Sequence, residues 1–144
     1  FRFVHFATHG FLPVEPGAQE PALILSYDGQ AEERMMLTMS EIVQLKLHAE
    51  MVVLSACNTG SGRVTRAEGV ASLGTSFLAA GASSVTVSLW QVSDDTTALL
   101  MEEYYRNLLT GMPKNAALAA ARAALFAKGH TNPFFWAPFV LTGE

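Results

Sequence analysis

Cysteine is almost absent from this chain, since Cys57 is the only one among 144 residues. A single cysteine cannot form an internal disulfide. The sequence also lacks a signal-peptide pattern and an apolar run of the ~18 residues that a membrane-spanning helix requires. We therefore expect a protein of the reducing cytoplasm that does not enter a membrane.

Charged residues are also scarce, at 15% of the chain, and acidic residues outnumber basic ones by 13 to 9. The net charge of -4 provides no overall positive field, so we expect no direct contact with nucleic acid. Hydrophobic residues make up half of the sequence. This composition is typical of one well-packed domain and not of a disordered chain.

The first residues, FRFVHFATHG, have the pattern of a strand and do not begin with methionine. We expect from this that the chain is part of a longer protein. An edge or apolar face of the first strand would then be covered by the preceding region.

Apolar β-rich runs alternate with helical periodicity along the chain. We expect strands over 3–7, 22–26, 34–38, 51–56, 83–90 and 134–143, and helices over 41–47, 68–80, 94–109 and 113–128. Ser40 is the expected cap of the first helix, Gly81 and Gly111 are expected to end later ones, and residues 60–69 are expected to form a loop. The order of elements predicts an α/β fold, a three-layer α/β/α sandwich around a mostly parallel sheet.

Polar residues follow two of the expected strands, in HFATHG and VVLSACNTG. Because chemistry in open α/β sheets gathers at the carboxyl ends of parallel strands, His9 and Cys57 are expected to be neighbours. An imidazole can help to form the thiolate that acts as a nucleophile. The backbone N–H groups of Gly10 and Cys57 are candidates for an oxyanion hole.

Other interpretations of these residues remain open at this point. A lone cysteine in an apolar strand is often a small buried hydrophobe, and a histidine at a strand end is often a structural polar group. A phosphate-binding loop fits poorly, because CNTGSGRV lacks both the Lys-Ser/Thr pair of a P-loop and the third glycine of a dinucleotide site. In papain-like enzymes the cysteine precedes the histidine, whereas Cys57 follows His9 by 48 residues.

A metal site is disfavoured by the same residues. Zinc sites in proteins commonly use several cysteines or closely spaced histidines. The histidines here are scattered, at His5, His9, His48 and His130. We therefore expect no metal and no cofactor.

Four segments, in order, resemble the CHAT domain, a caspase-like cysteine peptidase of the group that includes separase. They are HFATHG, VVLSACNTGSG, EGVASLGTSFLAAGASSVTVSLWQVSDDTT and FFWAPFVLTG, and the resemblance extends from near the first residue to near the last. The resemblance implies a caspase-haemoglobinase sandwich in which His9 and Cys57 form the catalytic dyad. CHAT domains often follow tetratricopeptide (TPR) repeats in bacterial proteins. The resemblance thus implies that residues 1–144 are the C-terminal, catalytic part of the domain, with a TPR or sensor region before it.

The function implied by this resemblance is a cysteine endopeptidase that acts on a protein or peptide substrate under the control of a fused or bound partner. The alternative is a regulatory scaffold module that keeps the fold without proteolysis. His5 lies on the same expected strand face as His9, and we interpret it as a structural histidine.

The segment LWQVSDD resembles the Trp-x-Val-Thr-Asp run of separase, in which the acidic residue receives arginine. Asp94 matches that residue, while Ser93 replaces the threonine. The resemblance therefore implies a preference for a basic residue before the cleaved bond, although Asp94 or Asp95 is also a candidate helix cap. Ser55 and Trp90 are further candidates for substrate binding, and core packing is an equally good interpretation of Trp90.

Overall fold

The computed structural model describes residues 1–13, 19–26, 35–55, 57–58, 65–90 and 93–144. Within these residues the strands form two four-stranded sheets. The main sheet has the order β1-β5-β7-β8, with bounds β1 Phe3–Phe6, β5 Met51–Leu54, β7 Ser84–Ser88 and β8 Phe139–Gly143. The second sheet has the order β4-β3-β2-β6, with bounds β4 Met36–Thr38, β3 Ala22–Ile24, β2 His9–Phe11 and β6 Cys57–Asn58.

The main sheet is mostly parallel. β1 pairs with β5 and β5 with β7 in parallel, whereas the edge strand β8 returns antiparallel to β7. Parallel neighbours need a crossover segment, and helix α2 (Thr65–Ala79) supplies one between β5 and β7. The carboxyl ends of β1, β5 and β7 consequently lie at one edge of the sheet.

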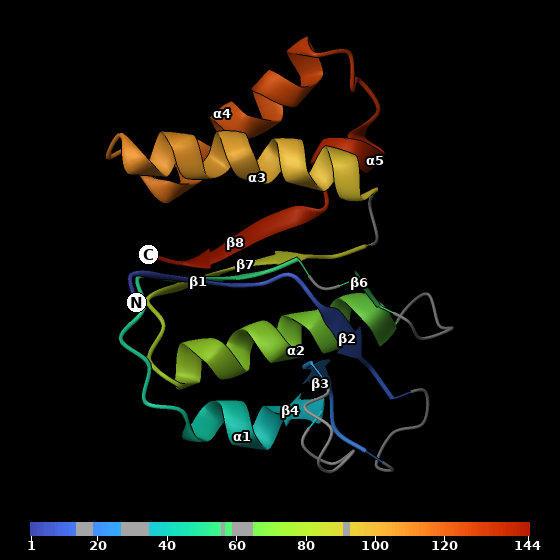
Figure 1. The fold of residues 1–144 in the computed structure, drawn as a ribbon, viewed down its shortest axis with the longest axis vertical. Coiled ribbons are helices and arrows are strands. Elements are labelled where there is room, and N and C mark those ends of the chain that lie inside the picture. Colours follow the sequence, from blue (N-terminus) through green and yellow to red (C-terminus); the bar gives the residue numbers. More distant parts are fainter. Residues whose placement is uncertain (14–18, 27–34, 56, 59–64, 91–92) are drawn as a thin grey trace.

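Helices lie on both faces of the main sheet (Figure 1). One face carries α1 (Met39–Gln44) and α2, and the other carries α3 (Asp94–Leu109), α4 (Lys114–Ala127) and α5 (Pro133–Trp136). Among the described residues, no helix is both long and apolar enough to cross a membrane. A mostly parallel sheet combined with helices was expected from the sequence and is confirmed.

The apolar run of β5 is explained by cores on both faces of the sheet. Val52 and Leu54 belong to the cluster formed with α1 and α2, whereas Met51 and Val53 belong to the cluster formed with α3 and α4. All four side chains have no exposed area. Burial of each such side chain contributes about 1.5–3 kcal/mol, so β5 is the best anchored strand of the fold.

The alternation of β1 determines how it pairs with β5. Val4 and Phe6 pack on the α2 side, while Phe3 packs on the α3 side and the His5 side chain contacts Tyr105 of α3. A slip of one position would turn every side chain of β1 to the opposite face and place the imidazole among apolar groups. The observed register therefore keeps His5 beside the hydroxyl groups of Tyr105 and Ser55.

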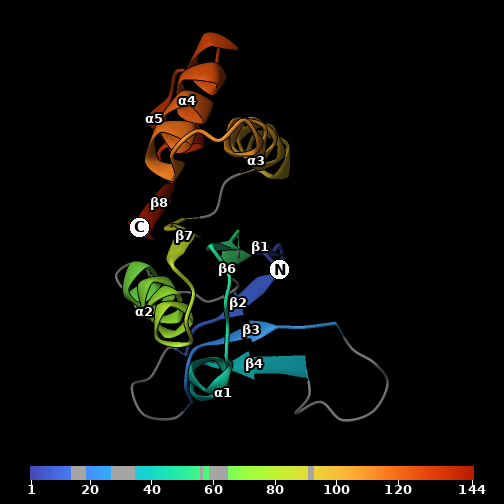
Figure 2. The ribbon, with the colours of Figure 1, turned by 90° about the vertical axis from the view of Figure 1, so that its left-hand side faces the viewer.

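The chain continues beyond β1 into β2, which the sequence did not predict to be a strand. β2 pairs antiparallel with β3 and parallel with β6, and Figure 2 shows this second sheet extending from the main sheet to α1. At the bend, the Thr8 hydroxyl donates to the backbone carbonyl of Ile24. This contact fixes the turn from one sheet into the next. The strands expected over 22–26 and 34–38 correspond to β3 and β4, which pair antiparallel.

Two element boundaries differ from the predictions because side chains cap the helices elsewhere. Thr38, and not Ser40, caps α1 through a capping box in which Thr38 and Glu41 bond to each other's backbone N–H groups. Residues 134–136, predicted as the beginning of a strand, belong instead to the short helix α5. The Asn132 side chain accepts from the Phe134 N–H, and Pro133 suits the first helical position.

Other boundaries shift by a few residues. Helix α2 begins at Thr65, so the expected loop over 60–69 is wrong for its last residues, while residues 60–64 lie outside the described residues. Ala56, the expected end of β5, also lies outside them. Pro113 is the N-cap of α4 and not part of its first turn. Strand β8, which follows Pro138, is an edge strand of the main sheet, where a proline is tolerated.

Gly81 and Gly111, which follow α2 and α3, provide a test of the helix ends. Both have positive φ, at 108° and 87°, but an added Cβ would lie 2.4 Å from the Leu47 carbonyl oxygen at Gly81 and would meet nothing within 4 Å at Gly111. We expect Gly111→Ala to lower the free energy of unfolding by about 1–2 kcal/mol, the cost of the left-handed conformation. Gly81→Ala should cost clearly more, because a backbone atom must also move. Urea unfolding of both variants measures the difference, and equal losses would contradict the steric argument.

Candidate functional site

His9 and Cys57 lie directly opposite each other in neighbouring strands. β2 and β6 pair in parallel, with His9 opposite Cys57 and Gly10 opposite Asn58. The separation of 48 positions is the same as in the main sheet, where Phe3 lies opposite Met51. The two expected site residues are thus brought together by one continuous strand register.

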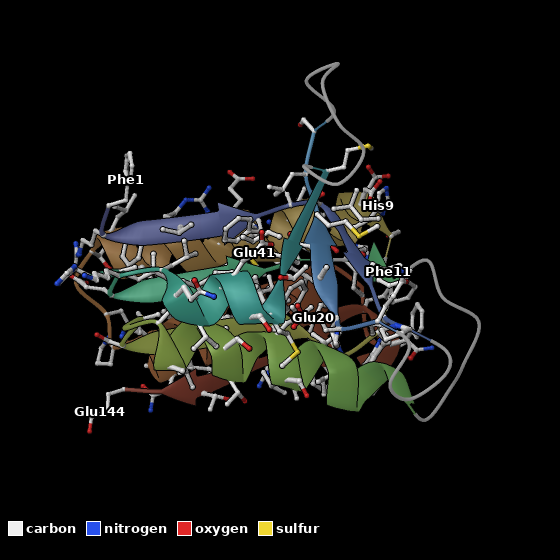
Figure 3. All side chains as sticks on the ribbon, turned by 90° about the horizontal axis from the view of Figure 1, so that it is seen from below. Phe1, His9, Phe11, Glu20, Glu41 and Glu144 are labelled. Atoms are coloured by element: carbon white, nitrogen blue, oxygen red, sulfur yellow. The ribbon has the colours of Figure 1, made fainter. Side chains whose placement is uncertain are left out.

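This pairing lies at the carboxyl edge of the parallel strands. Figure 3 shows His9 at the end of the molecule opposite to Phe1 and Glu144. The N–H of Ser55 donates to the carbonyl of Phe6 at 3.1 Å, which extends the contact between the two strands beyond the main sheet. Backbone hydrogen bonds therefore hold the two segments together immediately before the site.

An open cleft of about 430 Å³ lies beside His9. One wall comes from the ends of β1 and β5 and from the bend into β2, and the other comes from the first turns of α3. Its described lining residues are His5, Ala7, Thr8, His9, Ser55, Asp94, Thr97, Ala98 and Met101. The cleft is large enough to receive a side chain or a short extended peptide next to His9.

Asp94 faces this cleft from the beginning of α3. The N-cap of the helix is Ser93, whose side chain accepts from the Thr96 N–H, so capping by Asp94 or Asp95 is wrong. Asp94 is the first helical residue and is exposed. Its carboxylate is thus available to a positively charged group in the cleft, and the helix N-terminus favours a negative charge there.

Three polar side chains form a connected network along the sheet wall. His5 Nε2 lies 2.7 Å from Ser55 Oγ, and His5 Nδ1 lies 3.0 Å from the Tyr105 hydroxyl. Desolvation by the surrounding side chains lowers the pKa of His5, so the ring is neutral near pH 7. Burial, together with the nearby Tyr104, raises the pKa of Tyr105 to about 12, which keeps its hydroxyl protonated.

Gly10 and Trp90 occupy different environments. Gly10 is buried and lies between β3 and β6, opposite Leu23 on one side. Trp90 is 38% exposed, and its indole N–H donates to the carbonyl of Phe134 at 3.0 Å. Trp90 is not among the described residues that line the cleft, so its role in substrate binding stays a prediction.

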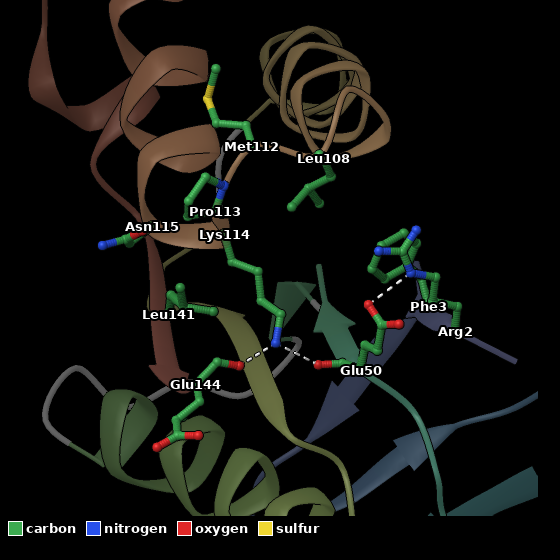
Figure 4. A pocket seen from close by; sticks show the side chains of 12 residues that line it. Arg2, Phe3, Glu50, Leu108, Met112, Pro113, Lys114, Asn115, Leu141 and Glu144 are labelled. Carbon is green, nitrogen blue, oxygen red and sulfur yellow. Dashed lines mark hydrogen bonds and ion pairs between the residues drawn. The ribbon is translucent and has the colours of Figure 1, made fainter.

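A second cleft, of about 450 Å³, lies at the opposite end of the main sheet (Figure 4). The Lys114 ammonium group donates there to the backbone carbonyls of Glu50, at 2.9 Å, and Glu144. Arg2 is paired with the Glu50 carboxylate at 2.7 Å. Its described lining residues include no histidine, cysteine or serine, so this cleft offers no nucleophile and no base of the kind found beside His9.

The sequence analysis missed how His5 and α3 contribute to the cleft. His5 was interpreted as structural, yet it lines the cleft together with His9, and the remaining wall comes from Thr97, Ala98 and Met101. The spacing of these residues from Asp94 corresponds to one face of a helix, which was a usable signal. Among the described residues, no three His, Cys, Asp or Glu side chains gather as a potential metal site.

Comparison with known proteins identifies the family. The CHAT domain model matches residues 1–144, the whole chain. Tetratricopeptide repeat protein 28 of Mus musculus is 36% identical over 111 residues, which cover 76% of this chain and 4% of that protein. The protein of the same name from Homo sapiens is 36% identical over 113 residues, which cover 78% of this chain and 4% of that protein. The match thus spans only a small part of the relatives' length. The chain belongs to the CHAT domain family, which is related to caspase-like peptidases.

Proposed function

We propose that this domain is a cysteine endopeptidase with Cys57 as the nucleophile and His9 as the general acid and base. The observation that carries the proposal is the strand register that sets His9 opposite Cys57 at the rim of a cleft. A thiol and an imidazole on adjacent strand ends are the components of a nucleophile–base pair. The resemblance of the THG and SAC segments to CHAT peptidases supports the same two residues.

The first half of the reaction forms an acyl-enzyme. The Cys57 thiolate attacks the carbonyl carbon of the scissile peptide bond and gives a tetrahedral oxyanion. The protonated imidazole of His9 then donates its proton to the amide nitrogen, the C–N bond breaks, and the amine product leaves. The acyl group remains on Cys57 as a thioester.

The second half releases the acyl group. His9, now neutral, takes a proton from water, and the hydroxide formed attacks the thioester carbonyl. The C–S bond breaks, and the carboxylic acid product and the thiolate–imidazolium pair are regenerated. Backbone N–H groups of Gly10 and Cys57 would stabilise the oxyanion in both halves, because glycine allows a close approach of the main chain.

Asp94 is proposed to bind a basic side chain before the cleaved bond. It lines the same cleft as His9 from the opposite wall, and Ser93 has taken over the capping role that was the alternative for it. A bound substrate would exclude water from the cleft. A carboxylate there forms a charge-assisted pair with a guanidinium group, and a neutral side chain in place of the carboxylate cannot form this pair.

The proposal also includes the type of fold and a longer protein in which this domain lies. Helices on both faces of a mostly parallel sheet support the α/β/α sandwich of the caspase-haemoglobinase type. The relatives are named as tetratricopeptide repeat proteins, which supports a TPR region that controls this domain in a longer protein. A bacterial source and a cytoplasmic location remain predictions from the sequence.

The dyad is tested by Cys57→Ala and His9→Ala in the full chain. Loss of the nucleophile should reduce peptide cleavage to background, and loss of the general acid should lower kcat by at least about 100-fold. His48→Ala is the matched control, because His48 is exposed and does not line the cleft. Circular dichroism verifies that each variant folds.

A thiol-reactive peptide electrophile gives an independent readout, since it should label the chain only when Cys57 is present. Cleavage that survives in Cys57→Ala would refute the peptidase mechanism. Absence of both cleavage and labelling in the unsubstituted chain would favour a scaffold module that retains the CHAT fold.

The pocket is tested with two peptides that differ only in Arg or Leu before the cleaved bond. The unsubstituted chain should prefer Arg in kcat/KM, and Asp94→Asn should lower this preference at least about tenfold, because a hydrogen bond to a charged group is lost. Asp95→Asn is the matched control, since the neighbouring carboxylate is also exposed but is not among the described lining residues. A preference for Leu, or an equal effect of both substitutions, would contradict the proposal that Asp94 binds the basic side chain.

A further inference from the structure

A further cleft, of about 380 Å³, is lined by residues of α4 and α5. Its described lining residues are Arg122, Ala123, Phe126 and Trp136, and it shares none of them with the cleft beside His9. The two helices are in contact, and Figure 2 shows them at the end of the molecule farthest from α1. This cleft is therefore separate from the candidate active site.

Arg122 brings a positive charge to this cleft without an acidic partner. Its side chain is partly buried, its Nη2 donates to the backbone carbonyl of Phe139, and its Nε is buried with no hydrogen-bond partner among the described residues. No carboxylate among those residues forms an ion pair with it. The nearby Tyr104 hydroxyl supplies no counter-charge, because burial raises its pKa. A partly desolvated cation of this kind is stabilised by an anion that approaches from outside.

Aromatic side chains form much of the remaining wall. The Trp136 ring packs against the hydrophobic core, and its indole N–H donates to the carbonyl of Thr131 at 3.4 Å, so the ring has a defined orientation. Phe126 is 53% exposed, although it is a large apolar residue. Aromatic and arginine side chains are enriched where proteins bind one another, and exposed aromatic residues there act as anchors. The surroundings of Arg122 thus favour a protein segment over a free inorganic anion.

We propose that this cleft binds a segment of a partner protein in which a large apolar side chain lies next to a carboxylate. The apolar side chain packs against Phe126 and Trp136, and the carboxylate pairs with Arg122. A guanidinium–carboxylate pair is charge-assisted and can use two parallel N–H donors, so the acid is recognised by geometry as well as by charge. The proposal does not depend on peptidase activity, because it concerns a different surface of the domain.

Two peptides with blocked ends, Gly-Leu-Glu-Gly and Gly-Leu-Gln-Gly, test the role of the charge. They contain no basic residue, so the specificity proposed for the cleft beside His9 does not apply to them. Nuclear magnetic resonance titration of the full chain follows the indole N–H signal of Trp136. The Glu peptide should bind at least about tenfold more tightly than the Gln peptide, because its carboxylate forms a charge-assisted pair.

Substitutions of Arg122 test whether it is the partner of the carboxylate. Arg122→Gln should bring the two affinities close together, whereas Arg122→Lys keeps the charge and should retain part of the difference. Arg106→Gln is the matched control, because that guanidinium is already paired with Glu102 at 2.6 Å and Glu103 at 2.7 Å and does not line the cleft. Circular dichroism verifies that each variant folds, since Arg122 also bonds to Phe139.

Phe126→Ala tests the aromatic wall at a residue that is exposed enough for the fold to survive its loss. It should weaken the binding of both peptides about fivefold and leave the ratio of their affinities unchanged. Leu109→Ala is the control, because Leu109 is 75% exposed and does not line the cleft.

Absence of binding, equal affinities of the two peptides for the unsubstituted chain, or a difference that Arg122→Gln leaves unchanged would overturn the inference. Light scattering tests the other occupant, a second copy of this domain. Self-association of the unsubstituted chain that Arg122→Gln abolishes would assign the cleft to that second copy and would also overturn the inference.

Discussion

Two segments far apart in the sequence run side by side in one register, and the candidate site is the end of that pairing. Phe3 lies opposite Met51 in the main sheet and His9 lies opposite Cys57 in the second, 48 positions apart in both cases. No residue is gained or lost across the bend, although the strands pass from one sheet into another. The burial of β5 on both faces anchors this pairing, and the polar side chain of His5 specifies which face of β1 meets α3. The spacing of the site is therefore set by the core.

Helix α3 contributes residues both to the hydrophobic core and to the cleft. Leu100, Tyr104 and Leu108 are buried in the core against the main sheet. The start of the same helix presents Asp94 and Thr97 to the cleft. Because the two sets of residues share one rigid element, the position of the carboxylate is defined by apolar packing several turns away. A site built on strand ends and a helix start is held more tightly than one built on loops alone.

The pattern of the sequence predicted most elements, because their signals are local. Periodicity identified the four longer helices and the buried strands, and glycine identified the ends of α2 and α3. The errors arose where local signals compete. Thr38 and Ser40 are both good caps, and only Thr38 has Glu41 three residues later to complete a capping box. At 134–136 the aromatic residues favoured a strand, but Asn132 and Pro133 start a helical turn before them.

The sequence by itself determined the family, the class of fold and the identity of His9 and Cys57 as the site to examine, because these depend on residue types and on short motifs. Only the tertiary structure decided that the two residues pair across β2 and β6, and that Asp94 shares a cleft with His9 after Ser93 caps α3. The contacts of His5 were also decided there, since its partners Ser55 and Tyr105 lie 50 and 100 positions away. Contacts at such separations arise from strand register and helix packing, which no local pattern of residues encodes.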